Sequence, residues 1–463
     1  MIEQGVLERV LGRALRDGGD FAEVFVEDRV SSNAVLDDGR IEELTSGRER
    51  GAGIRVITGE STGFAHTTDL SEAGLLEAAA VASAAARGAS SGVRTIALSR
   101  RDVVPASIAV RPETISKTAK VELLRRAEAA ARGAGGDVRQ VMAALADNRR
   151  RFLVANSDGV FAEDDQTRTR LAVQAVAVGD TGMQTGFEAV AGVKGWEIFD
   201  ERSPEDVAEE AARRALLKIN ARPAPSGSLP VVIGPGSGGV LFHEACGHGL
   251  EADLVSKGAS TFAGRVGDQV ASPLVTLVDD GTVVGAWGHL GVDDEGHPAT
   301  RNVLIQDGVL TEYMWDGLRA RNEKRGGTGN GRRQTYKVLP MVRMTNTYLL
   351  NGASDPDDII ASTERGVYVK KLGGGQVDTA SGDFVFGMVE SYLIENGEIT
   401  DPLRESNLIG NGPDVLRGID AVANDFQFSD GGGMCGKDGQ SVPVGMGQPT
   451  LRVAAMTIGG TAS

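Results

Sequence analysis

The first half of the chain alternates between helical and strand-like hydrophobic patterns. Residues 3–16 carry apolar side chains at spacings of three and four, which predicts an amphipathic helix. Two alanine-rich helices are expected near 71–87 and 116–132. From 138 to 195, apolar and polar residues alternate between Asn and Gly turns, which is typical of strands. This half is therefore predicted to combine helices with a sheet.

A further helix and a linker follow. The helix is expected to begin after Ser203, because Pro204 stands at the first helical position and Asp206 lies three residues after the cap, and to run to about Ile219. The segment ARPAPSGS (221–228) clusters Pro, Gly and Ser, so neither a helix nor a strand is expected to continue through it. We expect the linker between two parts of the protein here.

Beyond the linker, strands and turns dominate. After the strand LPVVIG (229–234), one stretch from about 236 to 255 has helical spacing. Three later segments place Asp-Gly or Asn-Gly between apolar runs, which is the strongest local signal for a hairpin. They are VTLVDDGTVVGAWG, NVLIQDGVLTEYMW and SYLIENGEITDP. The second half is therefore predicted to be rich in antiparallel strands.

These patterns predict the α+β fold class. An N-terminal α+β region covers 1–220, with room for two subdomains at about 1–90 and 110–220. A mostly antiparallel β domain covers 229–463 and carries the helical stretch near its start. The chain has 63 glycines among 463 residues, about twice the average usage of ~7%, which agrees with many turns and short strands.

Charge and cysteine usage narrow the class of protein. With 48 basic and 64 acidic residues the formal net charge is −16, which argues against nucleic acid or an anionic membrane as the main partner. The two cysteines cannot build a disulfide framework, which fits a reducing compartment. The start lacks a secretory pattern, and no apolar run approaches the ~20 residues that span a bilayer. We therefore expect a soluble cytoplasmic protein.

The segment FHEACGHGLEAD places two of the five histidines close together, at His243 and His248, with Glu244 beside the first. In the familiar zinc-peptidase motif the histidines are four residues apart and share one helix face. Here they are five apart, which on an ideal helix separates them by about 140°. A one-residue π-bulge would bring them together, and Gly247 and Gly249 would ease it. We therefore predict that the helix over 243–248 is irregular.

If a metal binds, His243 and His248 supply imidazole ligands and Glu244 acts as general base on the bound water. The alternative is a histidine pair without metal, one packed and one solvated. A second alternative is a nucleotide site, because Gly234–Gly239 matches G-x-G-x-x-G between a strand and a helix. No second βαβ unit follows, so a glycine-rich start to a buried helix is the preferred interpretation.

A catalytic zinc ion normally takes three protein ligands. The spacing leaves seven candidates for the third: Glu251, Asp253, His289, Asp293, Asp294, His297 and Cys435. Cys435 lies in the glycine-dense loop DGGGMCGKDGQSVPVG, where the backbone can approach a site closely, although a lone cysteine is usually a small buried residue. Cys246, inside the histidine motif, is interpreted as a packing residue.

Three further features concern charged segments and the remaining histidines. The basic residues of 319–343 form either a loop over the cleft that binds peptide carboxylates or a solvated or intersubunit loop. The acidic runs 163–165 and 293–295 are expected to be solvated turns, although the second could also line the site. His66, His289 and His297 are expected to be structural.

From His243 to residue 461 the chain resembles the TldD branch of the TldD/PmbA (TldD/TldE) metalloprotease family. The blocks that carry the resemblance include HEACGHGLEADLVSKGASTFAGRVGDQVAS, TGNGRRQTYKVLPMVRMTNTYL, GGGQVDTASGDFVF and GMCGKDGQSVPVGMGQPTLRV. DGRIEELTSGRERGAGIRVITGESTGFAHTTDL resembles the family's N-terminal block. Coverage is nearly end to end and weakest at 88–135.

The resemblance implies a metallopeptidase with an H-E-x-x-x-H site. On that pattern His243, His248 and Cys435 bind zinc (Zn2+) and Glu244 is the catalytic acid/base. All four residues are present, so the chain is expected to be the active subunit, acting on peptides or unfolded segments beside a TldE/PmbA-like partner, with a homodimer left open. A non-catalytic binding or regulatory protein and a nucleotide-dependent enzyme remain the alternatives.

Overall fold

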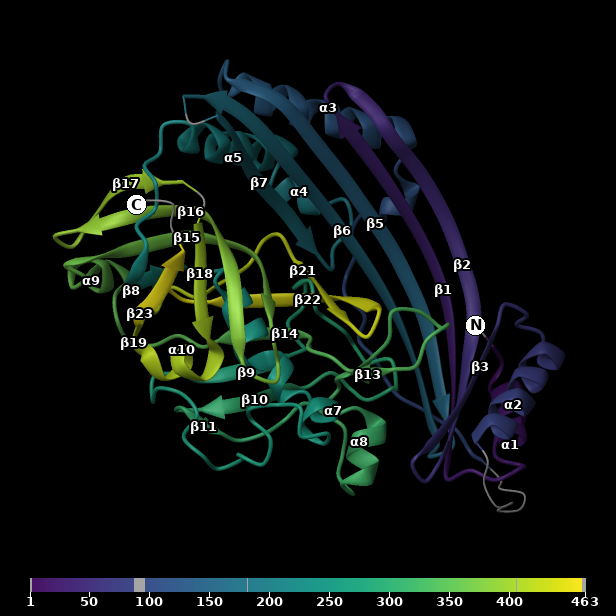
Figure 1. The fold of residues 1–463 in the computed structure, drawn as a ribbon. Coiled ribbons are helices and arrows are strands. Elements are labelled where there is room, and N and C mark those ends of the chain that lie inside the picture. The colour runs from purple at the N-terminus through teal and green to yellow at the C-terminus, as the bar shows by residue number, and fades with distance from the viewer. Residues whose placement is uncertain (1, 87–95, 181, 405, 460–463) are drawn as a thin grey trace.

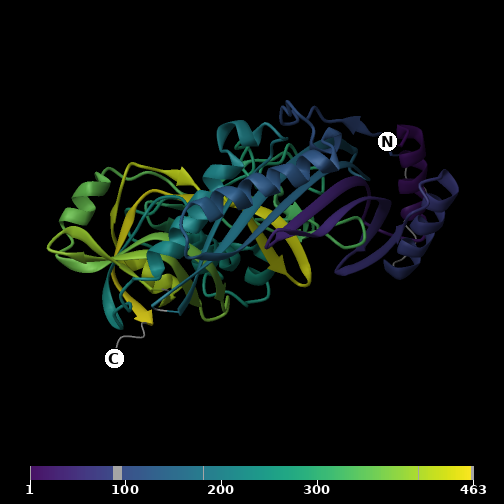
Figure 2. The same ribbon diagram turned by 90° about the horizontal axis from the view of Figure 1, so that it is seen from above.

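A curved N-terminal sheet lies beside two C-terminal sheets (Figure 1). The computed structural model describes residues 2–86, 96–180, 182–404 and 406–459. Seen from above, the molecule is elongated, and the two chain termini lie toward opposite ends (Figure 2).

Seven described strands form the N-terminal sheet, in the order β3-β2-β1-β5-β6-β4, with β7 paired to β6. Their bounds are β1 Phe21–Asp37, β2 Arg40–Thr58, β3 Ser61–Thr67, β4 Ser99–Arg100, β5 Val138–Asn156, β6 Val160–Gly179 and β7 Gly182–Gly192. All pairs except β4–β6 are antiparallel. In the turn between β1 and β2, Asp38 and Gly39 take φ angles of 47° and 82°, as a tight Asp-Gly hairpin requires.

Alternation along the strands decides what each face of this sheet contacts. Val24 and Val26 of β1 pack against α1 and α2, whereas Phe25 between them packs with Phe152 and with Tyr336 from the C-terminal half. The bounds of the main helices are α1 Gln4–Ala14, α2 Glu72–Ala86, α3 Lys117–Gly133 and α5 Pro204–Lys218. The helices cover one face of the sheet, and the C-terminal part of the chain covers the other.

The four helices predicted in the first half are confirmed, with ends that differ by at most two residues from the expected ones. At the start of α5, Ser203 and Asp206 form the expected capping box. Two shorter turns accompany these helices, a 3₁₀ turn at Pro112–Thr114 and α4 at Ile198–Glu201.

One C-terminal sheet closes on itself, because β15 pairs both with β8 and with β16 at the two ends of the order β15-β8-β23-β18-β16. The strands β17 and β19 pair with β16 and β23. The bounds are β8 Gly227–Ile233, β15 Arg365–Val377, β16 Asp383–Glu395, β17 Glu398–Leu403, β18 Ser406–Asn411, β19 Ile419–Val422 and β23 Leu451–Gly459.

A second C-terminal sheet has the order β11-β10-β9-β14-β22-β20, with β21 paired to β22 and a separate β12–β13 pair nearby. The bounds are β9 Leu277–Asp280, β10 Arg301–Gln306, β11 Val309–Leu310, β12 Gly331–Arg332, β13 Met341–Val342, β14 Asn346–Leu349, β20 Gln427–Phe428, β21 Gly433–Lys437 and β22 Gln440–Gln448. The short helices are α6 Gly239–Phe242, α7 Ala252–Val255, α8 Gly317–Asn322, α9 Pro356–Ala361 and α10 Gly412–Gly418.

Two of the three predicted hairpins are confirmed. Asp307-Gly308 joins β10 to β11, and Asn396-Gly397 joins β16 to β17. The hairpin predicted around Asp280-Gly281 is wrong, because β9 pairs with β10 and β14 and the residues after Gly281 continue as turns. The local turn signal is overridden there by pairing with strands that are distant in sequence.

The fold confirms the predicted α+β class, with mostly antiparallel sheets. Parallel pairing is limited to β4–β6, β8–β15 and β14–β22 among the named strands. In the part of the chain that the structure describes, every helix is too short or too polar to cross a membrane.

Candidate metal centre

The histidine motif forms a π-turn. After α6, residues His243–Gly247 take π-helical geometry, and the backbone N–H of His248 donates to the carbonyl of His243. A 3₁₀ turn, His248–Leu250, follows. The π-turn confirms the prediction that this helix is irregular. It brings the centroids of the two imidazole rings to 4.9 Å from one another, with the ring planes at 84°.

Glycines let neighbouring backbone approach this turn. A Cβ on Gly239 of α6 would lie 2.3 Å from the backbone nitrogen of Gly447 on β22. A Cβ on Gly412 of α10 would lie 2.1 Å from the carbonyl oxygen of Ala245 in the π-turn. Larger residues at either position would push the turn away from its supports.

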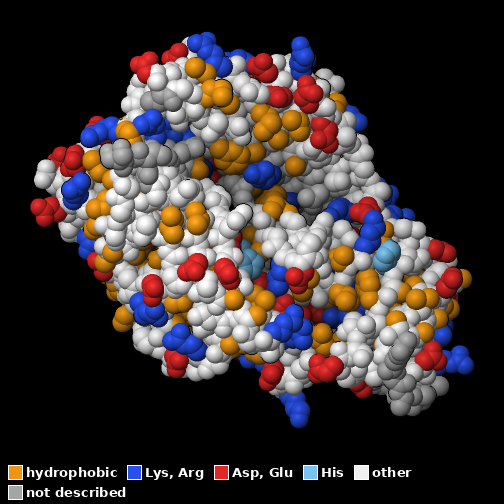
Figure 3. Space-filling view, viewed as in Figure 1, with side chains coloured by type: hydrophobic (Ala, Val, Ile, Leu, Met, Phe, Trp, Pro, Cys, Tyr) orange, Lys and Arg blue, Asp and Glu red, His pale blue; other side chains and the backbone are white. Residues whose placement is uncertain are grey.

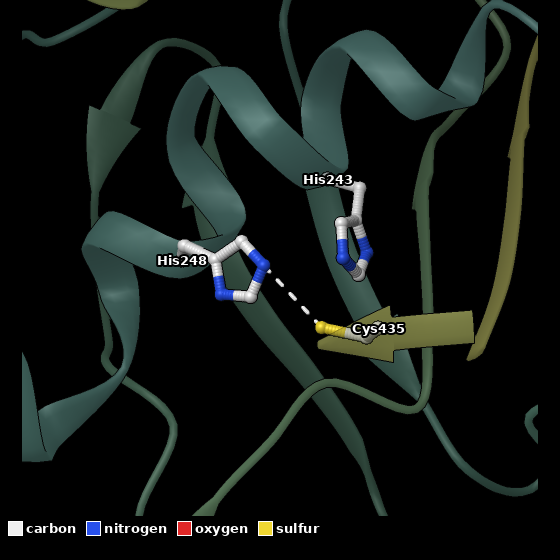
Figure 4. Close-up of side chains that lie close together, drawn as sticks. All are labelled: His243, His248 and Cys435. Carbon is white, nitrogen blue, oxygen red and sulfur yellow. Dashed lines mark hydrogen bonds between the residues drawn. The ribbon is translucent and has the colours of Figure 1, made fainter. Parts of the chain in front are cut away.

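Cys435 reaches the histidines from β21 (Figure 4). Its Sγ lies 3.3 Å from Nε2 of His248. One potential ligand atom from each of His243, His248 and Cys435 lies within 4.8 Å of the others, and all three residues are buried. The structure therefore brings together the three residues proposed as ligands, although 187 positions separate His248 from Cys435.

The three residues fit a bound metal ion. Among the described residues, Nδ1 of His243 is buried without a hydrogen-bond partner. Nδ1 of His248 is instead 3.1 Å from a carboxylate oxygen of Glu251. Histidines that bind a metal through one ring nitrogen are commonly oriented in this way, by a carboxylate at the other nitrogen. Two imidazoles and a thiolate are a donor set suited to zinc, with a further position left for water.

Glu251 and Lys437 support the ligands from behind. The Lys437 ammonium lies 2.8 Å from Oε2 of Glu251 and 2.7 Å from Oδ1 of Asp253. Burial raises the pKa of Glu251, but the charges and hydrogen bonds of His248 and Lys437 have the larger effect and lower this pKa to about 2. Glu251 and Asp253, two candidates for the third ligand, are thus committed to ion pairs behind the site.

The charges at the site favour a thiolate. Burial opposes ionisation of Cys435, but the adjacent His243 and His248 rings outweigh it and lower the pKa of the thiol to about 4. The pKa of Cys246, by contrast, is raised to about 12 by burial, and its Sγ contacts the carbonyl oxygen of Phe242 at 3.3 Å. The interpretation of Cys246 as a packing residue is confirmed.

Glu244 lies at the edge of the centre. One carboxylate oxygen is 3.9 Å from Nε2 of His248, and 19% of the side chain is exposed. Burial raises the pKa of Glu244, partly offset by His243 and His248. The carboxyl group is therefore close to the histidines yet open to a neighbouring cavity.

That cavity has a volume of about 440 Å³ and is lined by both halves of the chain. His243 and Glu244 contribute one part of its wall, Arg170 and Phe187 come from the N-terminal sheet, and Gly374 lies in a glycine run of β15. Figure 3 shows this side of the molecule hollowed near its centre, with basic and histidine side chains among hydrophobic ones. Glu244 is therefore accessible from this cavity.

The remaining candidate ligands lie elsewhere. His289 contacts the Gly281 carbonyl through Nδ1 at 2.9 Å. Asp293 accepts hydrogen bonds from the backbone N–H groups of His297 and Gly331. Asp294 forms an ion pair with Arg150 at 2.8 Å. The ion pair of Asp294 joins the two halves of the chain, whereas these contacts of His289 and Asp293 lie within the C-terminal half.

The two acidic runs are not solvated turns, and that prediction is wrong. Asp293, Asp294 and Glu295 are all buried, where Arg150 and Arg55 balance their charge. The run 163–165 lies within β6 rather than in a turn. The second half of the chain covers the sheet face that carries Arg55 and Arg150, which the local sequence does not reveal.

The basic segment 319–343 divides in two. Arg332, Arg333 and Arg343 are buried, and Arg343 donates to the carbonyl oxygen of Cys435. The exposed part around α8 lines a separate cavity of about 390 Å³. The segment is therefore not a loop over the cavity that contains Glu244.

The glycine run Gly234–Gly239 has a packing role. A Cβ on Gly238 would lie 2.4 Å from the Gln448 side chain, and the helix that follows has only four residues before the π-turn. The preferred interpretation, a glycine-rich start to a buried helix, agrees with this packing, and the nucleotide alternative is not favoured. The contacts of Lys437 and the supporting role of Glu251 were not predicted, and Arg343 was expected only as part of the basic segment, because these contacts come from distant strands.

Three family models cover most of the chain and define its class. PmbA/TldA metallopeptidase domain 1 matches residues 22–86, the central domain matches 110–219, and the C-terminal domain matches 226–460. The protein belongs to the PmbA/TldD metallopeptidase family, which confirms the resemblance seen in the sequence.

Individual relatives agree. The chain is 42% identical over 449 residues to a protein of Haemophilus influenzae named metalloprotease TldD homolog, covering 96% of this chain and 93% of the relative. It is 30% identical over 269 residues, 57% of this chain and 58% of the relative, to the zinc metalloprotease TldD homolog of Saccharolobus solfataricus. The crystal structure of TldE from Thermococcus kodakarensis has the same fold, with a TM-score of 0.75 at 20% identity, covering 98% of this chain and 100% of that one.

Proposed function

We propose that this protein is a zinc-dependent peptidase in which His243, His248 and Cys435 bind the metal and Glu244 is the catalytic acid/base. The observation that carries the proposal is the convergence of three buried ligand atoms within 4.8 Å, beside a carboxylate that lines a cavity. The donor set and the name of the Saccharolobus relative support zinc as the metal.

The side chains have distinct tasks in this proposal. When bound, a zinc ion would supply a Lewis acid for the scissile carbonyl and for a water molecule. Glu244 accepts a proton from the attacking water on its carboxylate and delivers it to the leaving amine. Glu251 holds the His248 ring through Nδ1, and Lys437 holds Glu251, so that the Nε2 atom stays directed toward Cys435.

An extended peptide or unfolded segment is the substrate that the cavity suits. β15 pairs with β16 on one side, whereas on the other side β8 reaches only Val367–Val369 among the described strands. The glycine run 373–375 on this open part lines the cavity beside Glu244. A peptide can add there as a strand, through main-chain hydrogen bonds that tolerate many side chains.

The likeness in fold to a TldE structure supports an assembly with a TldE/PmbA-like partner, in which this chain is the active subunit. A thiolate ligand requires a reduced cysteine, which fits the cytoplasm. We retain the division proposed from the sequence, with an N-terminal region at 1–220 and a metallopeptidase domain at 229–463.

The test joins zinc analysis to peptide cleavage. Purified protein, alone and with a TldE-type partner, is expected to contain about one zinc per chain and to cleave an unfolded reporter peptide until a chelator removes the metal. Cys435→Ser is expected to lower zinc occupancy, whereas Cys246→Ser, at a residue outside the ligand set, retains it. Equal zinc content in the two variants would remove Cys435 from the ligand set.

A further inference from the structure

The cavity beside Glu244 contains a cation that the proposed function does not use. Arg170 lies on β6, on the sheet face that contacts the C-terminal half, and lines the cavity with Phe187 and Leu372. Its Nε donates to the carbonyl oxygen of Gly431 at 3.1 Å. Gly431 belongs to the loop that leads into β21 and Cys435. The guanidinium is therefore anchored at one nitrogen, close to the metal-binding strand.

Arg170 differs from the other basic groups around it. Among the described residues no carboxylate forms an ion pair with Arg170, and burial alone lowers its pKa. Lys371 lines the same cavity but lies 2.5 Å from Glu188. Arg168, two residues earlier on the same strand face, donates to the carbonyls of Trp287 and His289. Arg170 thus presents positive charge to the cavity, and it has no ion-pair partner in the part of the chain that the structure describes.

A half-buried guanidinium without an ion-pair partner is unfavourable, and an anion that pairs with it removes this cost. The planar fork of arginine matches a carboxylate, and such charge-assisted pairs are about twice as strong as neutral hydrogen bonds. In a peptidase cavity the natural source of that anion is the substrate itself.

We infer that Arg170 binds a carboxylate of the substrate, so that the enzyme favours peptides that place a carboxylate near the bond to be cleaved. The inference rests on the proposed peptidase function. The carboxylate belongs either to an Asp or Glu side chain or to the peptide's C-terminus, and both offer the same pair of oxygens. Arg170 is on this account a residue that determines specificity.

Peptide binding tests this without turnover. Zinc-loaded Glu244→Gln protein is titrated with a fluorescent peptide made with a free or an amidated C-terminus, and with Gln replaced by Glu at each position in turn. We expect at least about 10-fold tighter binding for one carboxylate-bearing form, and the arm that shows it identifies the source. Equal affinity across both arms would overturn the inference.

Substitution then assigns the preference to Arg170. In the same background, Arg170→Gln is expected to abolish the preference while neutral peptides bind within about 2-fold of their original affinity. Arg126→Gln, which removes a surface arginine on α3 paired with Glu205, is the matched control and retains the preference. Arg170→Lys keeps the charge without the fork, so a reduced preference is expected.

One outcome would show that Arg170 only holds its loop. If Arg170→Gln lowers zinc content and weakens neutral and acidic peptides equally, its bond to Gly431 is its whole role and the inference fails. If Arg170→Gln does not fold, the peptide series on the unsubstituted Arg170 and the Arg170→Lys variant still decide the question.

Different results would contradict the role of Arg170 and the proposed peptidase function. Cleavage by the zinc-loaded enzyme with no dependence on carboxylates would overturn the role of Arg170 and leave the peptidase standing. Carboxylate-selective binding through Arg170 in a protein that cleaves none of these peptides would support the site and contradict the peptidase.

Discussion

A buried ion cluster joins the two walls of the cavity beside Glu244, and removing one carboxylate from it provides a quantitative test of the fold. Glu390 on β16 accepts hydrogen bonds from Arg213 and Arg214 of α5, at 2.6 and 2.8 Å, and from the Tyr392 hydroxyl at 2.7 Å. Its side chain is 0% exposed. Arg214 also pairs with Glu188 of β7, which holds Lys371 of the cavity wall.

The pKa of Glu390 gives the size of its contribution to the free energy of unfolding. Burial raises it, but the bonds from Arg213, Tyr392 and Arg214 outweigh burial and lower it from 4.5 to about 2. That lowering corresponds to ~3 kcal/mol of stability. Because the folded pKa is depressed, this stability is complete above pH 4.5 and is lost as the pH falls toward 2.

We therefore expect Glu390→Gln to lower the free energy of unfolding by ~3 kcal/mol at pH 7, since it leaves the buried Arg214 and the partly exposed Arg213 short of a partner. At pH 3.5 the difference should shrink to ~2 kcal/mol, because the unfolded wild-type carboxyl is by then largely protonated. Urea unfolding followed by tryptophan fluorescence at both pH values measures the two differences.

Glu205→Gln is the matched control. Glu205 also pairs with an arginine, Arg126, and lies on α5, but the side chains are 34% and 53% exposed, so a loss below ~1 kcal/mol is expected. Equal losses in the two variants, or a Glu390→Gln difference that does not change with pH, would refute the reasoning.

Two further predictions concern the metal centre. Gly239→Ala places a Cβ 2.3 Å from the backbone of Gly447, so it should lower both thermal stability and zinc occupancy. Gly436→Ala is the control, because a Cβ there meets no atom within 4 Å and should change neither quantity. Equal effects of the two substitutions would contradict the packing. Glu251→Gln should weaken zinc affinity by roughly 10–100-fold in a chelator competition assay, because the His248 ring loses its charged partner, and unchanged affinity would exclude that support.

The π-turn could be predicted from the sequence because helix geometry is local. Two histidines five residues apart cannot share a face of an α-helix, so a shared site required an inserted residue, and the structure contains it at His243–Gly247. The amphipathic helices and two Asp-Gly or Asn-Gly hairpins were predictable for the same reason.

Other features depend on contacts that spacing does not encode. Cys435 comes from a strand far along the chain, and only the resemblance to the family singled it out among seven candidate ligands. The run Asp293–Glu295 was expected in solvent but is buried, because Arg150 and Arg55 of the opposing sheet balance its charge. The pair formed by Glu251 and Lys437 likewise connects residues from different elements.

In the proposed mechanism Glu244 is the group that moves the proton and is not a metal ligand. Zinc content and peptide cleavage, measured on the same preparations of wild-type and Glu244→Gln protein, test this most directly. For Glu244→Gln we expect unchanged zinc content and a rate lower by roughly 10²–10⁴-fold, the usual contribution of a general acid–base. Cleavage at the wild-type rate by the zinc-loaded variant would contradict it.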